Sequence, residues 1–202
     1  MKKTLLGLLL LFVFNGYSQA QTDKHKQDSM RIAKFKARAF YPMFNAGAMS
    51  GVLPVENVDE KPDTNRDYKL LFEFTLQSSD TTHQSMNDGY TQMCRVLNLH
   101  VASGIPWSRI HPVILIHGPS LFSVINNDAY KTKYKTDNPN ISIVEQLQKA
   151  GVKFIVCGQY MTFVDIKKEQ LLPGIKLSLT AKTVLSNYQE QGYVLYPINE
   201  ER

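Results

Sequence analysis

Two short polar segments that follow apolar runs carry the side chains best suited to chemistry in this 202-residue sequence. The run KFIVC ends in Cys157 and is followed by Gly158 and Gln159, and the run PVILI is followed by His117 and Gly118. Ligand sites in open parallel sheets form outside the carboxyl ends of the strands. If the two runs are neighbouring strands, the Cys157 thiol and the His117 imidazole share one crevice at that edge.

A cysteine in this position has a specific chemical use. The thiolate is the nucleophilic form of cysteine, and a nearby imidazolium or the amides at a helix N-terminus stabilise it. Gly158 would let backbone amides approach whatever the sulfur holds, as an anion-binding nest does. Cys157 is therefore the candidate catalytic residue, and the candidate ligand-binding residues are His117, Gly118, Gly158 and Gln159.

The same residues also allow structural interpretations. A cysteine after a strand is often simply buried, and a strand-end histidine often bonds only to loop backbone. Gly158 can serve the turn alone. The segment HGPS, which contains Ser120, is similar to the oxyanion loops of hydrolases, but the sequence has no G-x-S-x-G motif. A serine hydrolase is therefore the least favoured hypothesis.

The second cysteine, Cys94, lies on the apolar stripe of a predicted helix, where core packing is the expected role. A disulfide requires Cα atoms within about 7 Å of each other. A mid-helix cysteine and a strand-end cysteine are expected to miss that distance, so no bond to Cys157 is predicted. The histidines and acids show no metal-ligand spacing, and no nucleotide-binding glycine motif occurs. We expect neither a metal nor a cofactor.

The elements that must position these residues alternate along the chain. Apolar runs predict five strands, and apolar residues three or four positions apart predict helices between them. Alternating strands and helices imply right-handed crossovers and a mostly parallel sheet. We predict one α/β domain over 65–198, a three-layer sandwich around a five-stranded sheet. Its strands are expected near 69–76, 112–116, 153–157, 175–179 and 193–198, and its helices near 85–103, 121–134, 141–150, 161–172 and 181–191.

The N-terminus has the three parts of a secretory signal. A pair of lysines is followed by an apolar run over 5–14 and by small residues near position 20. Residues 1–20 are therefore predicted to be a cleaved signal peptide, which places the mature protein in the periplasm or outside the cell without a membrane span. Residues 21–64 are rich in basic residues first, and then in Gly, Pro, Asn and Asp. They predict a basic leader followed by an extended, loosely structured arm.

The formal net charge of +5 belongs to the N-terminal segment rather than to the predicted domain. Residues 1–20 carry two lysines and no acid, and residues 21–40 carry six basic and two acidic side chains. From residue 41 onward, 15 basic residues stand against 16 acidic ones. Nucleic-acid binding requires a basic face on the domain itself, so it is not expected here.

Four segments between residues 68 and 197 resemble the DsrE/DsrF-like family of small α/β proteins associated with sulfur relay, and its exported branch in particular. The segments are YKLLFEFT, VILIHGPSL, DNPNISIVEQLQKAGVKFIVCGQ and LLPGIKLSLTAKTVLSNYQEQGYVLYP. The resemblance implies a compact α/β sandwich that assembles as homo-oligomers, either trimers or multiples of them. It also implies that a cysteine after a central strand carries sulfur as a persulfide, and Cys157 is the matching position.

Two functional hypotheses follow. In the first, Cys157 binds or relays sulfane sulfur between a donor and an acceptor protein, and His117 or Gln159 orients the group. Any enzyme activity would then be of the sulfurtransferase type. In the second, the domain is not catalytic and either binds a small ligand in the strand-end crevice or forms an oligomeric assembly in the periplasm. An accessible, reactive thiol is expected only from the first.

Overall fold

A computed structural model describes residues 26–199 and contains one sheet of five strands. The strand order is β4-β3-β2-β1-β5, and every pairing is parallel. The predicted α/β fold is therefore confirmed, and its sheet is parallel throughout. The predicted signal peptide lies outside the described residues. The strands are β1 (Tyr68–Phe74), β2 (Ile110–Ile116), β3 (Lys153–Cys157), β4 (Lys176–Ser178) and β5 (Val194–Ile198).

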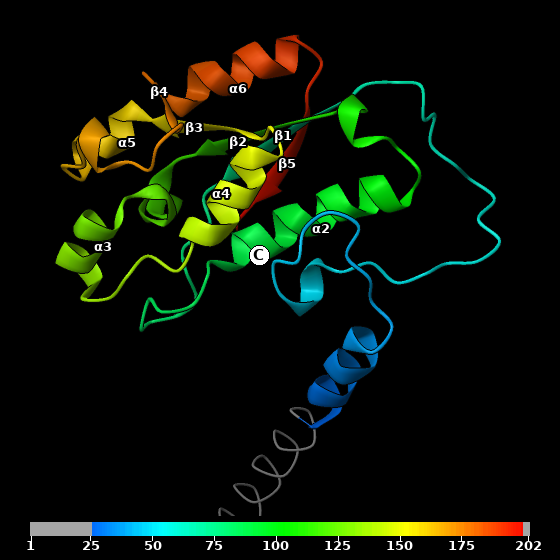
Figure 1. Cartoon of the computed structure of the whole chain (residues 1–202). Helices are drawn as coiled ribbons and strands as arrows, with labels where there is room; N and C mark the ends of the chain where they lie inside the picture. The colour runs from blue at the N-terminus through cyan, green and yellow to red at the C-terminus, as the bar shows by residue number, and fades with distance from the viewer. Residues whose placement is uncertain (1–25, 200–202) are drawn as a thin grey trace, which may run out of the picture.

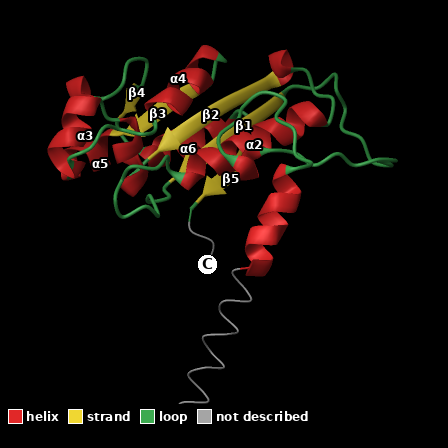
Figure 2. Ribbon diagram, turned by 60° about the horizontal axis from the view of Figure 1, so that its bottom comes forward, coloured by secondary structure: helices red, strands yellow, loops and turns green. Residues whose placement is uncertain are grey.

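Helices cover both faces of the sheet and complete a three-layer sandwich (Figure 1). α2 (Asp88–Ala102) and α4 (Ile141–Lys149) pack on one face, and α6 (Ala181–Glu190) packs on the other. Because side chains alternate along a strand, Leu70 of β1 joins the larger core cluster, whereas Leu71 joins the smaller cluster beneath α6. The strands point toward the end of the molecule where α3 and α5 lie (Figure 2).

The local sequence explains where α2 begins and which side it buries. The Asn87 side chain caps the helix by accepting a hydrogen bond from the Gly89 amide at 2.9 Å. Glycine is needed at this second position because a Cβ there would overlap the ring of Phe74. The apolar residues that follow are spaced three or four apart and are fully buried: Tyr90, Met93, Cys94 and Leu97.

Two of the predicted helices are interrupted, because an antiparallel bridge joins Ile125 to Leu171 and holds both residues in extended backbone. The Leu172 amide extends this contact by donating to the Val124 carbonyl at 2.9 Å. Helical periodicity carries no information about a long-range bridge of this kind. The helices found are α3 (Asn127–Tyr134) within the predicted 121–134 and α5 (Gly158–Phe163) at the start of the predicted 161–172.

The arm ahead of β1 is packed more closely than its composition indicates. Asn98, fully buried on α2, accepts hydrogen bonds from the Met43 and Phe44 amides at 3.1 and 3.0 Å. Its NH₂ group donates to the carbonyls of Phe44 and Ser50 at 2.7 and 2.8 Å. Phe44 thereby enters the larger core cluster. The loose structure expected for the arm does not extend to 40–52, because one buried amide organises this segment.

Candidate functional site

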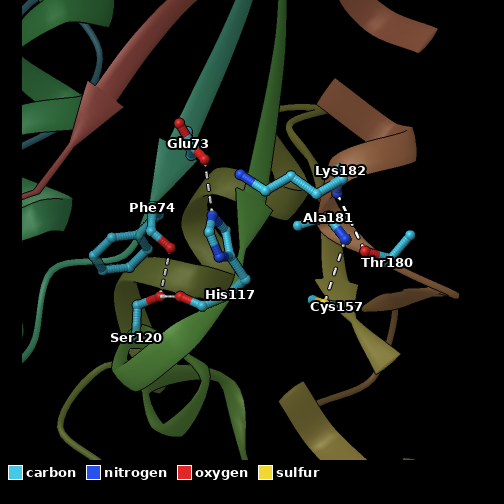
Figure 3. Close-up of polar contacts among 8 residues, drawn as sticks. All are labelled: Glu73, Phe74, His117, Ser120, Cys157, Thr180, Ala181 and Lys182. Carbon is cyan, nitrogen blue, oxygen red and sulfur yellow. Dashed lines mark hydrogen bonds and ion pairs between the residues drawn. The ribbon is translucent and has the colours of Figure 1, made fainter. Parts of the chain in front are cut away.

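Cys157 ends β3 with its sulfur beneath the N-terminus of α6 (Figure 3). The residue belongs to the core cluster on the α6 face and is 6% exposed. The amide of Ala181, the first residue of α6, donates a hydrogen bond to Sγ at 3.3 Å. The Thr180 hydroxyl caps the helix by accepting from the Lys182 amide at 3.3 Å. Because amides and peptide dipoles at this end of a helix favour negative charge, the sulfur lies where an anion is stabilised.

His117, directly after β2, is held by a carboxylate from the neighbouring strand. Its Nε2 lies 2.9 Å from Oε1 of Glu73, and the two side chains are 23% and 20% exposed. The Lys182 side chain, from the first turn of α6, points toward this pair (Figure 3). A neutral imidazole that donates Nε2–H to the carboxylate keeps Nδ1 available as a proton acceptor.

Cys157 and His117 lie on the same face of neighbouring strands. β2 and β3 are paired with Ile116 opposite Val156, and His117 and Cys157 are the next residues along. Neighbouring strands are about 5 Å apart, and residues in register point to the same side of a sheet. The structure therefore places Cys157 and His117 side by side at this edge of the sheet. Within residues 26–199, no hydrogen bond joins their side chains; the imidazole bonds to Glu73 instead.

Gly158 and Gln159 have structural roles that differ from the expected one. A Cβ on Gly158 would lie 2.7 Å from the Ser178 carbonyl oxygen, so glycine is required for close contact with β4. The Gln159 amide donates to the Leu179 carbonyl at 3.1 Å, which occupies it. The amide that meets the Cys157 sulfur comes from α6 rather than from the turn at Gly158.

The four candidate ligand-binding residues do not form one site. Gly158 and Gln159 line a surface pocket beside the edge strand β4, and neither His117 nor Gly118 lines it. Gly118 has a φ of +67° and forms the turn that ends β2. Of the four, only His117 belongs with the cysteine on the α6 face.

Ser120 is a structural residue rather than a nucleophile. It is fully buried, and its hydroxyl oxygen lies 2.5 Å from the Phe74 carbonyl oxygen and 3.0 Å from that of His117. These contacts fix the turn after β2 to β1. A buried hydroxyl that bonds to backbone does not meet a substrate, so the geometry gives the hydrolase hypothesis no support.

Cys94 differs from Cys157 in both location and environment. It lies on α2 in the core cluster of the opposite face of the sheet, whereas Cys157 faces α6. Both cysteines are free, and the sheet separates them. Burial raises the pKa of the Cys94 thiol to about 12. Cys94 is therefore protonated at neutral pH and is not a competing nucleophile.

Over residues 26–199, no three His, Cys, Asp or Glu side chains are grouped so that they could hold a metal ion. None of the helices found there combines the length and the apolar character needed to cross a bilayer.

Sequence reasoning missed three groups of the site: the Glu73 carboxylate, the Ala181 amide and the Lys182 side chain. Glu73 had a local signal, because it is the one acid in the otherwise apolar run LLFEF. A charge inside such a strand needs a partner, which here is His117. The α6 groups had no local signal, because their contact with β3 arises only in the folded chain.

A family model described as "DsrE/DsrF-like family" matches residues 90–197, more than half of the chain. The matched region lies in a parallel α/β sandwich with Cys157 at the end of β3. This chain belongs to the DsrE/DsrF-like family. The matched region includes His117 and Cys157, and it begins after β1, the strand that carries Glu73.

Seven chains among the solved structures match this protein. One of them is a protein of unknown function, MTH1491 from Methanobacterium thermoautotrophicum, with 13% sequence identity and a TM-score of 0.45. The match covers 65% of this chain and 99% of that chain. No curated protein matches the sequence.

Proposed function

We propose that this protein carries sulfane sulfur on Cys157. The observation that carries the proposal is the position of the sulfur, which accepts the Ala181 amide hydrogen at 3.3 Å at the N-terminus of α6. A persulfide is an anion at neutral pH, and this end of a helix stabilises an anion. Membership of a family associated with sulfur relay supports the same function.

The loading step conserves atoms and electrons. His117 accepts the Cys157 proton through Nδ1, and the thiolate attacks a sulfane sulfur of an inorganic polysulfide. A new S–S bond forms on Cys157, one S–S bond of the polysulfide breaks, and the shortened polysulfide leaves as the anion. No outside oxidant is needed. Glu73 fixes the imidazole, since its Oε1 lies 2.9 Å from Nε2.

The burial of Cys157 favours a small donor over a protein donor. With 6% of the residue exposed, a polysulfide ion reaches the sulfur more readily than a cysteine on another protein. The added sulfur extends about 2 Å beyond Sγ, the length of an S–S bond. A thiolate of an acceptor protein can attack that outer atom, which leaves the thiolate of Cys157 behind.

We propose a place of action from the N-terminal sequence. The signal-like pattern of residues 1–20 supports export, and with it the exported branch of the family, so the sulfur would be carried in the periplasm or outside the cell. Fusion of residues 1–20 to a reporter protein that is active only after export tests this location.

Intact-mass analysis of the chain from residue 21 tests sulfur carriage. After anaerobic incubation with tetrasulfide and desalting, the wild type should gain one sulfur mass, which dithiothreitol removes. Cys157→Ser should gain none. Cys94→Ser is the matched control and should load like the wild type, because the pKa of about 12 keeps Cys94 protonated. Equal loading of Cys157→Ser and the wild type would refute the proposal.

A second candidate function is homo-oligomeric assembly, which one surface feature favours. Three apolar side chains are exposed around the edge strand β4: Phe163 at 81%, Leu179 at 75% and Leu177 at 45%. Exposed apolar groups beside an unpaired strand edge are typical of a contact with another chain. We expect sedimentation to give a trimer or a multiple of it, and Phe163→Glu to weaken it. A monomeric wild type at micromolar concentration would contradict assembly through this edge.

A further inference from the structure

A pocket of about 350 Å³ lies at the carboxyl end of the sheet, on the side of the molecule that carries α2. Its walls come from the loop after β1, the turn after β2, α3 and the first turn of α5. Figure 1 shows α3 and α5 at this end of the molecule. We call it the α3 pocket. Open parallel sheets bind ligands at this edge, and the volume suits one small molecule.

Lys133 is the one charged side chain among the residues that line the α3 pocket. Lys133 Nζ lies 4.3 Å from the ring centroid of Phe122 and 5.3 Å from that of Tyr134. No Asp or Glu lines the pocket, and among the residues described Lys133 takes part in no ion pair. Lys131, two positions earlier on α3, is paired with Asp137 at 2.8 Å. The ammonium group of Lys133 therefore lies on an aromatic wall without an anion beside it.

The Asp80 carboxylate, on the loop that carries His83, is held by hydrogen bonds within that loop. The Asp80 carboxylate accepts hydrogen bonds from the amides of Thr82, Gln84 and Ser85 at 2.8, 2.9 and 2.7 Å, and from the Thr82 hydroxyl at 2.6 Å. These bonds lower its pKa and fix the loop that carries His83. Asp80 therefore shapes one wall of the α3 pocket, and within the described residues it makes no ion pair with Lys133.

The walls of the α3 pocket are fixed, whereas two groups at its surface are free to bind. The Tyr130 hydroxyl donates to the His83 carbonyl at 3.1 Å, and the Asn140 side-chain oxygen accepts from the Asn87 amide at 2.8 Å. Over the described chain, neither Lys133 Nζ nor the Tyr134 hydroxyl makes a hydrogen bond. Burial raises the pKa of Tyr134 to about 12, so this hydroxyl keeps its proton at neutral pH.

We propose that the α3 pocket binds a small planar carboxylate. The carboxylate lies against the Lys133 ammonium and accepts a hydrogen bond from the Tyr134 hydroxyl. The planar apolar body packs among the aromatic rings of Phe122 and Tyr160. Aromatic walls with one unpaired cation and one hydroxyl donor match both parts of such a ligand. The pocket shares none of these groups with the Cys157 site, so neither proposal depends on the other.

Titration of the ¹⁵N-labelled chain from residue 21 with cinnamate, followed by NMR, tests the proposal. Cinnamyl alcohol, which has the same planar body without the charge, is the matched probe. Cinnamate should shift the amides of α3 and of the turn after β2, and it should bind at least about fivefold more tightly than the alcohol. Lys133→Met should weaken cinnamate binding about fivefold, which corresponds to one charged contact at a partly exposed position.

Lys131→Met is the control, because it removes the same charge from the same helix outside the pocket. It should leave cinnamate binding unchanged, and so should Cys157→Ser. Equal binding of cinnamate and cinnamyl alcohol would overturn the proposal, because the cation would then have no role. Equal weakening by Lys131→Met and Lys133→Met would also overturn the proposal, because the carboxylate would then be attracted by the overall positive charge of α3 and not by Lys133 in the pocket. If cinnamate changed no amide chemical shifts around α3, the proposal would be overturned as well.

Discussion

Replacement of Ala181 by proline should slow the loading of Cys157 with sulfur about ten- to a hundredfold while the protein stays folded. Proline removes the amide hydrogen that Sγ accepts at 3.3 Å. A hydrogen bond to a charged group contributes about 1.5–3 kcal/mol, and that range corresponds to the expected loss of rate. The loading rate is measured by quenching the tetrasulfide reaction at intervals and determining the mass of the intact protein by mass spectrometry.

The backbone around Ala181 makes this substitution feasible. Ala181 is the first residue of α6, where proline is well tolerated because its missing amide has no partner within the helix. Thr180 has a φ of −151° and a ψ of 148°, which is the extended conformation favoured before proline. Unchanged circular dichroism and an unfolding midpoint close to that of the wild type would show that the fold is kept.

Ala181→Gly is the matched control, because it keeps the amide and removes only a methyl group. It should load within about twofold of the wild-type rate. A proline ring could also obstruct the thiol, and obstruction would grow with the size of the reagent. Alkylation by iodoacetamide and by a bulky maleimide therefore separates the two causes. A folded Ala181→Pro variant that loads at the wild-type rate would show that the helix amide does not assist Cys157.

The sequence predicted that Cys157 and His117 lie together only if their strands are neighbours, and β2 and β3 do pair. A strand that is buried on both faces reads as a continuous apolar run, as PVILI and KFIVC do. Alternation with helices predicted the parallel order, which placed both strand ends at one edge. The partners were not predictable in the same way, because Glu73 is 44 residues from His117 and Ala181 is 24 residues from Cys157. Those contacts depend on strand order and on how α6 lies across the sheet.

Gly158 shows why a motif alone misleads. A glycine next to a reactive side chain is typical of a turn that binds an anion, and equally typical of a place where two backbones pass closely. Only the geometry separates the two cases, and here a Cβ would lie 2.7 Å from the Ser178 carbonyl oxygen. The packing of the arm was missed for a related reason. Asn98 binds backbone groups 54 residues away, at Phe44, and such contacts leave no periodic pattern.

Raising the pH from 9.0 to about 12 should cost the native state about 4 kcal/mol through Cys94 alone. Burial raises the pKa of this thiol from 9.0 to about 12, because the thiolate is poorly solvated in the core. Above pH 9.0 the unfolded chain loses the proton, while the native chain keeps it. The native state therefore binds more protons, and the free energy of unfolding falls by about 1.4 kcal/mol for each pH unit. The contribution of Cys94 to the free energy of unfolding is fully present below pH 9.0.

Urea unfolding under a phosphine reductant between pH 8 and pH 11 measures this slope. Cys94→Ala removes the thiol, so its free energy of unfolding should start lower, because of the small cavity, and then fall less steeply than that of the wild type. Met93→Leu is the control, since it changes the same buried stripe without a titrating group and should keep the wild-type slope. Burial also raises the pKa of Tyr90, which adds a further loss at higher pH in all three proteins. Parallel curves for the wild type and Cys94→Ala would show that the buried thiol does not couple protonation to folding.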